Sequence, residues 1–308
     1  MAIAAMTATA QSKVYVTRDI SPESLVKIYN ALGRKAEGRV AVKISTGEMG
    51  GNNYLKPQLI KKLVKKVKGT IVECNTAYGG SRQDVKKHWE TIKAHGFLDI
   101  AKVDIMDEFG EIKIPTQDTT WLKYDIVGEH IQNYDFMINL AHYKGHQMGG
   151  FGGVLKNASI GVASTAGKAY IHSHGVTDKT PECWQHTSSQ DAFIESMAAA
   201  AQAVHNYFDN GQKILYIAVM NNMSIDCDCS SHPAAPLIAD YGIIASLDPV
   251  ALDQAAFDIV SQIHDDEHNN TKPLLNRIAK QHGTHILEWG EKIGLGSTRY
   301  ELVSLDKK

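Results

Sequence analysis

The sequence predicts an α/β protein with a parallel or mixed sheet flanked by helices, organised in two closely packed lobes. Three short segments rich in Val and Ile indicate strands: residues 38–45 (GRVAVKIS), 69–75 (GTIVECN) and 134–142 (YDFMINLAH). Amphipathic patterns at about 56–68 and 81–95 lie between them and indicate helices. Strands that alternate with helices are typical of a parallel sheet whose faces the helices cover.

The second half of the chain continues this alternation. Residues 241–264 (YGIIASLDPVALDQAAFDIVSQIH) indicate a short strand that leads directly into a helix. Asp248 is the expected N-cap of that helix, because its carboxylate can accept a backbone N–H, and Pro249 suits the first helical position. The other elements predicted here are helices at 189–209 and about 273–281, a strand at 213–224, and an edge strand at 300–305.

The chain divides into three parts. Residues 13–165 are expected to form an N-terminal α/β lobe and residues 166–308 a C-terminal α/β lobe, packed closely because no low-complexity linker separates them. Residues 1–12 are expected to be a disordered N-terminus or a signal-peptide remnant, since they are apolar and then small but lack a basic start. The localisation stays open: cytoplasmic, or exported if the N-terminus is such a remnant.

The composition is that of a folded protein with little attraction for nucleic acid. Of the 308 residues, 43% are hydrophobic and 21% are charged, and the formal net charge is -2. The basic segment 56–69 (KPQLIKKLVKKVKG) predicts the solvated face of an amphipathic helix, with an anion-binding face as the alternative. No apolar run reaches the ~18 residues of a membrane span. We expect a small-molecule or anionic ligand, no nucleic acid and no membrane span, with the oligomeric state undetermined.

Polar loops rich in Gly, His or Cys follow four of the predicted strands. They are STGEMGGNN (45–53), NTAYGGSR (75–82), HYKGHQMGGFGGVLKN (142–157) and IDCDCSSHP (225–233). In open α/β sheets, ligands bind beyond the carboxyl ends of the strands, where such loops converge. The sequence therefore predicts a site at this edge, in a cleft between the lobes.

Cys227 and Cys229 are candidate metal ligands. Thiolates suit a soft metal ion, and alternate residues of an extended segment point to the same side. Two sulfurs do not complete a tetrahedral site, so further ligands must come from elsewhere. His172 is a candidate further ligand; it lies in YIHSHG, where it and His174 alternate as they would on a strand. The alternative is a pair of inert or redox-active thiols in a loop.

Gly152 and Gly153 precede Lys156 and Asn157 in the third loop. A Gly-rich turn that enters a helix can present backbone N–H groups to an anion, so Gly152, Gly153 and Asn157 are candidate cofactor-binding residues. The glycines would let the backbone approach a ligand; the alternative is a tight turn with positive φ. The stretch matches neither the dinucleotide fingerprint nor a P-loop.

His142, His146 and Lys156 are the candidate catalytic residues, as acid-base groups or ligands. A histidine near its unperturbed pKa of ~6.5 suits proton transfer, and the pKa of a lysine desolvated beside a cation is lowered toward neutrality. The i, i+4 spacing of the two histidines does not indicate a helix here, because Gly145 and the preceding strand oppose one.

Asn75, Arg82 and Lys43 are further candidate cofactor-binding residues. Arg82 offers a planar two-point fork for a carboxylate. The alternatives are helix capping and a surface ion pair for the first two, and plain surface charge for Lys43. No Ser-His-Asp order, nucleophile elbow or His-Glu-x-x-His pattern occurs, so hydrolases of those classes are not expected.

Four segments together resemble the bacterial and archaeal family called domain of unknown function 362, over nearly the whole chain. They are VAVKISTGEMGGNNYLKP, NTAYGGSRQDVKKHWETIKAHGF, AHYKGHQMGGFGGVLKNASIGVAS with GKAYIH, and DCDCSSHPAAPLIADYGIIASLDPVALDQAAFDIV. Many members carry a ferredoxin-like insertion after the segment that corresponds to residues 167–172, with cysteines for two four-iron four-sulfur clusters. Between His172 and the long helix this chain has only Cys183, so it resembles a variant without the insertion, and such clusters are not expected in it. GGVLKN and its neighbouring histidines are also loosely similar to lactate racemase type proteins, which use a nickel pincer cofactor.

The resulting hypothesis is a metal- or cofactor-dependent enzyme of unspecified reaction. Its inter-lobe cleft would be lined by the Gly-rich, His and Cys-x-Cys loops, and a metal ion is one candidate cofactor. The alternative is a non-catalytic binding or electron-transfer protein that has lost its iron-sulfur insertion. In either case we expect His142, His146 and Lys156 to meet the Cys227/Cys229 pair, although about seventy residues separate the two groups.

Overall fold

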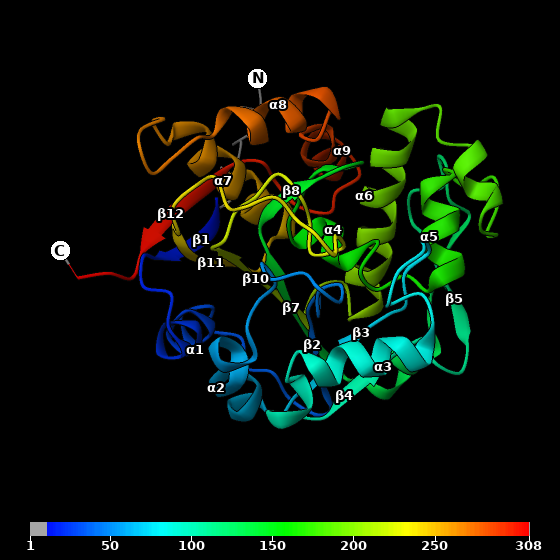
Figure 1. The fold of residues 1–308 in the computed structure, drawn as a ribbon, viewed down its shortest axis with the longest axis horizontal. Coiled ribbons are helices and arrows are strands. Elements are labelled where there is room, and N and C mark those ends of the chain that lie inside the picture. The colour runs from blue at the N-terminus through cyan, green and yellow to red at the C-terminus, as the bar shows by residue number, and fades with distance from the viewer. Residues whose placement is uncertain (1–10, 308) are drawn as a thin grey trace, which may run out of the picture.

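The computed structural model describes residues 11–307, which are built around one eight-stranded sheet (Figure 1). The strand order is β12-β1-β11-β10-β7-β2-β3-β4. Neighbouring strands are parallel except where β11 runs antiparallel to β1 and β10, so the predicted α/β class with a mixed sheet is confirmed. The strands are β1 Ser12–Thr17, β2 Val40–Lys43, β3 Thr70–Glu73, β4 Val103–Ile105, β7 Phe136–His142, β10 Ile214–Met220, β11 Gly242–Ser246 and β12 Tyr300–Ser304.

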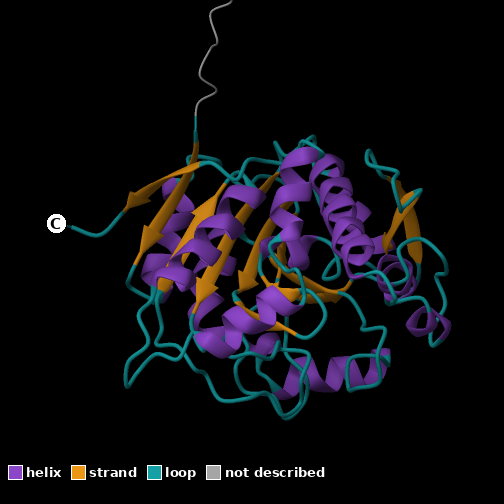
Figure 2. Ribbon diagram, turned by 90° about the horizontal axis from the view of Figure 1, so that it is seen from above, coloured by secondary structure: helices purple, strands orange, loops and turns teal. Residues whose placement is uncertain are grey.

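Helices cover both faces of the sheet (Figure 2). Helices α1 to α3 share one core with Ile138 and Ile217, and helices α4 to α9 share the other core with Met137 and Ala218. Successive residues of β7 and β10 thus point into opposite cores, and both strands are apolar on both faces. The helices are α1 Pro22–Ala31, α2 Pro57–Val67, α3 Val85–Ala94, α4 Val154–Ala158, α5 Thr165–His172, α6 Gln190–Tyr207, α7 Pro249–Gln262, α8 Lys272–Lys280 and α9 His285–Lys292. Within residues 11–307 no helix is long and apolar enough to span a membrane.

Capping side chains fix the starts of α6 and α7 at the predicted positions. Asp248 accepts the backbone N–H groups of Val250 and Ala251 at 2.9 and 3.0 Å, so it is the N-cap of α7 as expected. The hydroxyl of Ser189 caps α6 in the same way. The starts of these two helices therefore follow local chemistry that the sequence displays.

Strands from both predicted lobes join in the same sheet. Strand β1 lies between β11 and β12, and β7 pairs with β10, so the two halves of the chain alternate across the sheet. The proposed boundary between residues 165 and 166 falls inside α5 and marks no break in the sheet. β12 is an edge strand, as predicted. The expectation for residues 1–12 concerns mainly residues 1–10, which lie outside the described residues; Ser12 begins β1.

Two hairpins lie beside the main sheet. Strand β5 (Glu111–Pro115) pairs with β6 (Tyr124–Gly128), and β8 (Lys144–His146) pairs with β9 (Gly150–Gly152). Short 3-10 helices are found at Phe97–Asp99, Glu129–Asn133 and Glu182–Gln185. The β8–β9 hairpin occupies the Gly-rich stretch that was expected to be a loop.

The segment YIHSHG is helical at its start, which corrects the strand-like alternation expected for His172 and His174. Helix α5 begins after Ser164, whose hydroxyl accepts the N–H of Gly167, and it ends at His172. His174 follows with a φ of 42°. Two histidines separated by one residue are too short a pattern to indicate a strand. The cap at Ser164 favours a helix here instead.

Candidate functional site

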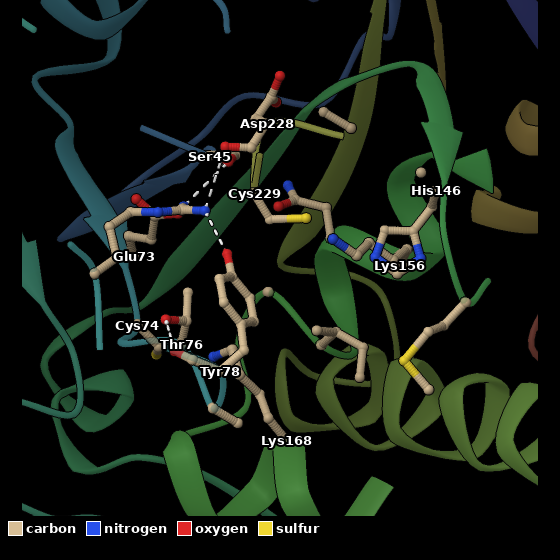
Figure 3. A pocket seen from close by; sticks show the side chains of 18 of the residues that line it. Ser45, Glu73, Cys74, Thr76, Tyr78, His146, Lys156, Lys168, Asp228 and Cys229 are labelled. Atoms are coloured by element: carbon tan, nitrogen blue, oxygen red, sulfur yellow. Dashed lines mark hydrogen bonds and ion pairs between the residues drawn. The ribbon is translucent and has the colours of Figure 1, made fainter. Parts of the chain in front are cut away.

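The loops that follow β2, β3, β7 and β10 converge beyond the carboxyl ends of these strands and line a cavity of about 340 Å³ (Figure 3). The predicted site residues that line it are Lys43, Arg82, His142, His146, Gly152, Gly153, Lys156, Asn157, His172 and Cys229. Asn75 does not line it, although its neighbours Cys74 and Thr76 do. Residues far apart in the sequence are thus brought to one place because parallel strands end at the same edge.

The β8–β9 hairpin carries Lys144 and His146 into the cavity wall. The N–H groups of Tyr143 and Gly145 donate to the carbonyls of Val219 and Ser224, which ties the hairpin to β10 and the segment after it. A Cβ on Gly145 would lie 2.3 Å from the carbonyl oxygen of Ile225. This glycine therefore permits a close backbone contact within the protein.

Helix α4, which carries Lys156, is held by a carboxylate from α7. Asp253 is fully buried and accepts the N–H groups of Val154 and Leu155, each at 2.9 Å. Burial raises the pKa of Asp253 to about 7, although the two N–H donors lower it. A Cβ on Gly153 would lie 2.2 Å from Asp253 Oδ1. The expected cradle of backbone N–H groups thus binds an internal carboxylate instead of a ligand.

Lys156 extends from α4 toward the interior of the cavity (Figure 3). Among the described residues, its amine makes no hydrogen bond and no ion pair. Burial, followed by the positive charges of Lys144 and Arg82, lowers the pKa of Lys156 to about 7. A substantial fraction of this amine is therefore unprotonated at neutral pH.

Asp228, the residue between the two cysteines, is bound by two side chains, Lys144 and His142. Lys144 Nζ donates to its Oδ2 at 2.7 Å, and His142 Nδ1 lies 2.9 Å from its Oδ1. Burial alone would raise the pKa of Asp228, but Lys144 and His142 outweigh it and hold that pKa well below the usual value. His142 Nε2 lies 2.6 Å from the carbonyl oxygen of Asn221, so both of its ring nitrogens have partners inside the protein.

Arg82 is neutralised by two buried carboxylates. Its Nη1 donates to Glu73 at 2.7 Å and its Nε to Glu48 at 3.2 Å, while Nη2 donates to the Tyr78 hydroxyl at 3.0 Å. The fork that was expected to bind a ligand carboxylate is thus occupied by carboxylates of the chain. Asn75 donates to Asp107 and contacts His88, so its amide positions this loop.

Lys43 and Asn157 form a second buried polar cluster. Lys43 Nζ donates to the carbonyl of Ile44 at 2.6 Å and to Asn157 Oδ1 at 3.2 Å, and burial lowers the pKa of Lys43 to about 8. Asn157 in turn donates to Asn139 at 2.7 Å. Lys43, Lys156 and Lys168 all line the cavity without a carboxylate in ion-pair contact within residues 11–307, so three amines of the wall have no carboxylate partner in the protein.

Cys227, Cys229 and His146 form a group that could hold a metal ion. Their two sulfurs and one ring nitrogen lie within 4.8 Å of one another, and the sulfurs are joined as a disulfide in this structure. His146 Nδ1 accepts the N–H of Gly149 at 2.8 Å, and burial, followed by the charge of Lys156, lowers the pKa of His146 well below its usual value. The neutral ring therefore carries its proton on Nε2.

His146, and not His172, is the histidine that lies with the cysteine pair. His172 Nδ1 lies 2.7 Å from the Lys168 carbonyl oxygen, and its ring stacks on Phe193 with centroids 4.9 Å apart. Burial lowers the pKa of His172 to about 4. The strand-like alternation that suggested His172 as a ligand fails because this residue ends a helix.

A family model described as a domain of unknown function (DUF362) matches residues 40–258, which is more than half of the chain. The chain belongs to the DUF362 family. The matched residues run from the start of β2 into α7 and include every residue that lines the cavity. Strands β1 and β12, at one side of the sheet, lie outside the match.

Comparisons of this DUF362 chain with curated proteins and with solved structures found at most low similarity. No curated protein matches it. The lactate racemase apoprotein from Thermoanaerobacterium thermosaccharolyticum is 15% identical, with a TM-score of 0.46, and the alignment covers 82% of this chain. A structural-genomics protein from Thermotoga maritima is 11% identical, with a TM-score of 0.42 and 88% of this chain covered. The chain spans 58% of the length of each, and neither supports an argument about function.

Several residues of the DUF362 cavity were not among the predicted ones. Lys144 lies in the HYKGH motif and Asp228 in the DCDC motif. In these motifs only the His and Cys residues were named as candidates, although Lys144 and Asp228 form an ion pair. Glu73 ends β3 and Lys168 lies in α5, so both face the cavity through tertiary structure alone. A charged residue at the carboxyl end of an otherwise apolar strand was the signal in the sequence that could have identified Glu73, which ends β3 as the predicted Lys43 ends β2.

Proposed function

We propose that this DUF362 chain is a metal- or cofactor-dependent enzyme that binds a small anionic substrate in the cavity. The observation that carries the proposal is the unpartnered amine of Lys156, which faces the cavity with a pKa of about 7. A group whose pKa is near the working pH is suited to both accept and donate a proton. An amine kept unpaired in a protein interior is also costly, which favours a functional reason for it.

The charge of the wall supports an anionic substrate. Arg82 and Lys144 are matched by Glu73 and Asp228, whereas Lys43, Lys156 and Lys168 have no such carboxylate partner among the described residues. Desolvated cations are stabilised by an opposite charge nearby. A bound carboxylate or phosphate would supply that charge.

The remaining candidates take different roles. His142 is a positioning residue, because both of its ring nitrogens bind within the protein and it orients Asp228. His146 is the second candidate for proton transfer, through Nε2. Gly152, Asn157 and His172 shape the wall around the substrate or cofactor, while Asn75 and Arg82 hold the loop after β3 in place.

A soft divalent ion fits the cysteine pair in its reduced form. Cys227, Cys229 and His146 match the Cys₂His ligand sets of catalytic zinc sites, which leave one position open. Both sulfurs must first be released from the disulfide, and His146 must free a ring nitrogen. A metal ion held there would act as a Lewis acid next to Lys156.

Zinc binding tests the proposal that Cys227, Cys229 and His146 hold a metal ion. Tag-free protein reduced under anaerobic conditions is expected to bind about one zinc ion per chain, because cysteine binds zinc as a thiolate and reduction releases both sulfurs from the disulfide. The oxidised protein and the Cys227→Ser/Cys229→Ser variant should bind none, measured by elemental analysis after dialysis. His172→Ala should retain zinc.

Two results would count against this site. Zinc retained by the double serine variant would place the metal elsewhere, and a reduced wild-type protein that binds no zinc would remove the metal from the proposal. If the cavity also failed to bind small anions, the non-catalytic alternative would be favoured.

A further inference from the structure

The disulfide between Cys227 and Cys229 has one buried and one accessible partner. Cys227 is 3% exposed, whereas Cys229 is partly exposed and lines the cavity, with its sulfur directed inward (Figure 3). In thiol–disulfide exchange, the accessible sulfur is attacked and the other one leaves as a thiolate. The geometry thus fixes a direction of attack, onto Cys229.

Donors and cations surround this pair. A ring nitrogen of His146 lies within 4.8 Å of both sulfurs, and the Gly149 N–H bound to Nδ1 leaves the ring proton on Nε2. Lys156, which has no carboxylate partner among the described residues, lies on the same wall, whereas the charge of Lys144 is matched by Asp228. Positive surroundings and N–H donors stabilise a thiolate, which is the leaving group of the exchange.

No other cysteine of the chain is placed to reduce the pair. Cys74 lines the cavity, but its thiol is buried and donates to the Val162 carbonyl at 3.1 Å, and burial raises its pKa, which disfavours the thiolate. Cys183 is also buried. Cys183 lies outside the cavity wall. A thiol that enters the cavity would supply the two electrons that convert the disulfide to a dithiol.

We propose that Cys227 and Cys229 form a redox-active pair that oxidises small anionic thiols bound in this cavity. The inference rests on the anion-binding part of the proposed function but not on the metal. Lys43, Lys156 and Lys168 give the cavity its preference for a thiol that also carries carboxylates. A cavity of about 340 Å³ suits a small molecule and excludes a folded protein partner.

The exchange balances without any further reactant. A substrate thiolate forms a bond to Cys229 Sγ, the Cys227–Cys229 bond breaks, and Cys227 leaves as a thiolate that takes up a proton. A second substrate thiolate then attacks the substrate sulfur of the mixed disulfide and releases Cys229. Two thiols are oxidised to one disulfide, and the protein disulfide is reduced to a dithiol.

The test uses the full-length, oxidised and metal-free protein with three thiols. Glutathione carries two carboxylates, mercaptoethanol is neutral and cysteamine is cationic, and each rate is corrected for the fraction of thiolate present. Reduction of the pair, followed by mass spectrometry after alkylation, is expected to be about tenfold faster with glutathione than with cysteamine. Lys156→Met should reduce the glutathione rate, and Lys61→Met, which removes an exposed lysine of α2, should not.

Single cysteine variants test the direction of attack. With oxidised glutathione, Cys227→Ser should form a mixed disulfide on Cys229 at least about tenfold faster than Cys229→Ser forms one on the buried Cys227. Equal rates in the two variants, or corrected rates that are the same for all three thiols, would overturn the inference. The thiol assay contains no metal, so a failure of the redox proposal would not affect the zinc-binding result. In the same way, a protein that binds no zinc could still oxidise thiols.

Discussion

Gly153→Ala is expected to lower the free energy of unfolding by about 3 kcal/mol, because the new methyl group meets a buried carboxylate. The added Cβ would lie 2.2 Å from Asp253 Oδ1, and Asp253 is fully buried and cannot move aside into solvent. Displacing it would also weaken its bonds to the N–H groups of Val154 and Leu155. Urea unfolding of the purified variant measures the effect.

Gly152→Ala is the matched control. Its Cβ would lie 3.5 Å from Lys144 Cε, an ordinary contact, and no positive φ is required there. We expect its stability to stay within about 1 kcal/mol of the wild type. If both variants were equally stable, the contact between Gly153 and Asp253 would not hold α4 in place, and the glycines would serve ligand approach as the sequence suggested.

Lys156→Met is expected to raise the thermal midpoint at pH 6 and to abolish anion binding. In the unfolded chain the lysine keeps an ordinary pKa near 10.5, whereas in the folded state it is about 7. Below pH 7 both states are protonated, and the folded protein bears the full cost of the buried charge. Between pH 7 and 10.5 only the unfolded state stays protonated, so this cost falls as the pH rises, by about 1.4 kcal/mol per pH unit at most.

The stabilisation by Lys156→Met should therefore be largest at pH 6 and shrink toward pH 10. Lys61→Met, on the exposed face of α2, should change the thermal midpoint little at either pH. A Lys156→Met protein that is less stable than the wild type at pH 6 would mean that the amine has a structural partner, and would remove the main argument for a functional lysine.

The main sheet could be predicted from the sequence because its central strands are buried on both faces. β2, β3, β7, β10 and β11 are short apolar runs with clear turn or helix signals between them. The β8–β9 hairpin was missed because its glycines and polar residues lack the alternation of a half-buried strand. Its conformation depends on contacts with Ser224 and Ile225, which are distant in the sequence.

The meeting of the polar loops at one edge of the sheet could be predicted, but most of the pairings between their side chains could not. That His142, His146 and Lys156 meet the cysteine pair follows from loops that share one sheet edge. Which donor binds which acceptor depends on tertiary distances. Arg82 binds carboxylates of its own chain, and the N–H groups of α4 bind Asp253; these partners are distant in the sequence, so no local pattern reveals them.

The pKa of Lys156 is the most direct measurement of the central claim, that this cavity holds a proton-transferring amine for an anionic substrate. ¹³C NMR of lysine-labelled protein should show one Cε resonance that titrates near pH 7 and is missing from Lys156→Met. Inorganic phosphate should raise its midpoint, because a bound anion favours the protonated amine. A Lys156 resonance that titrates near pH 10.5 and does not respond to phosphate would contradict the account.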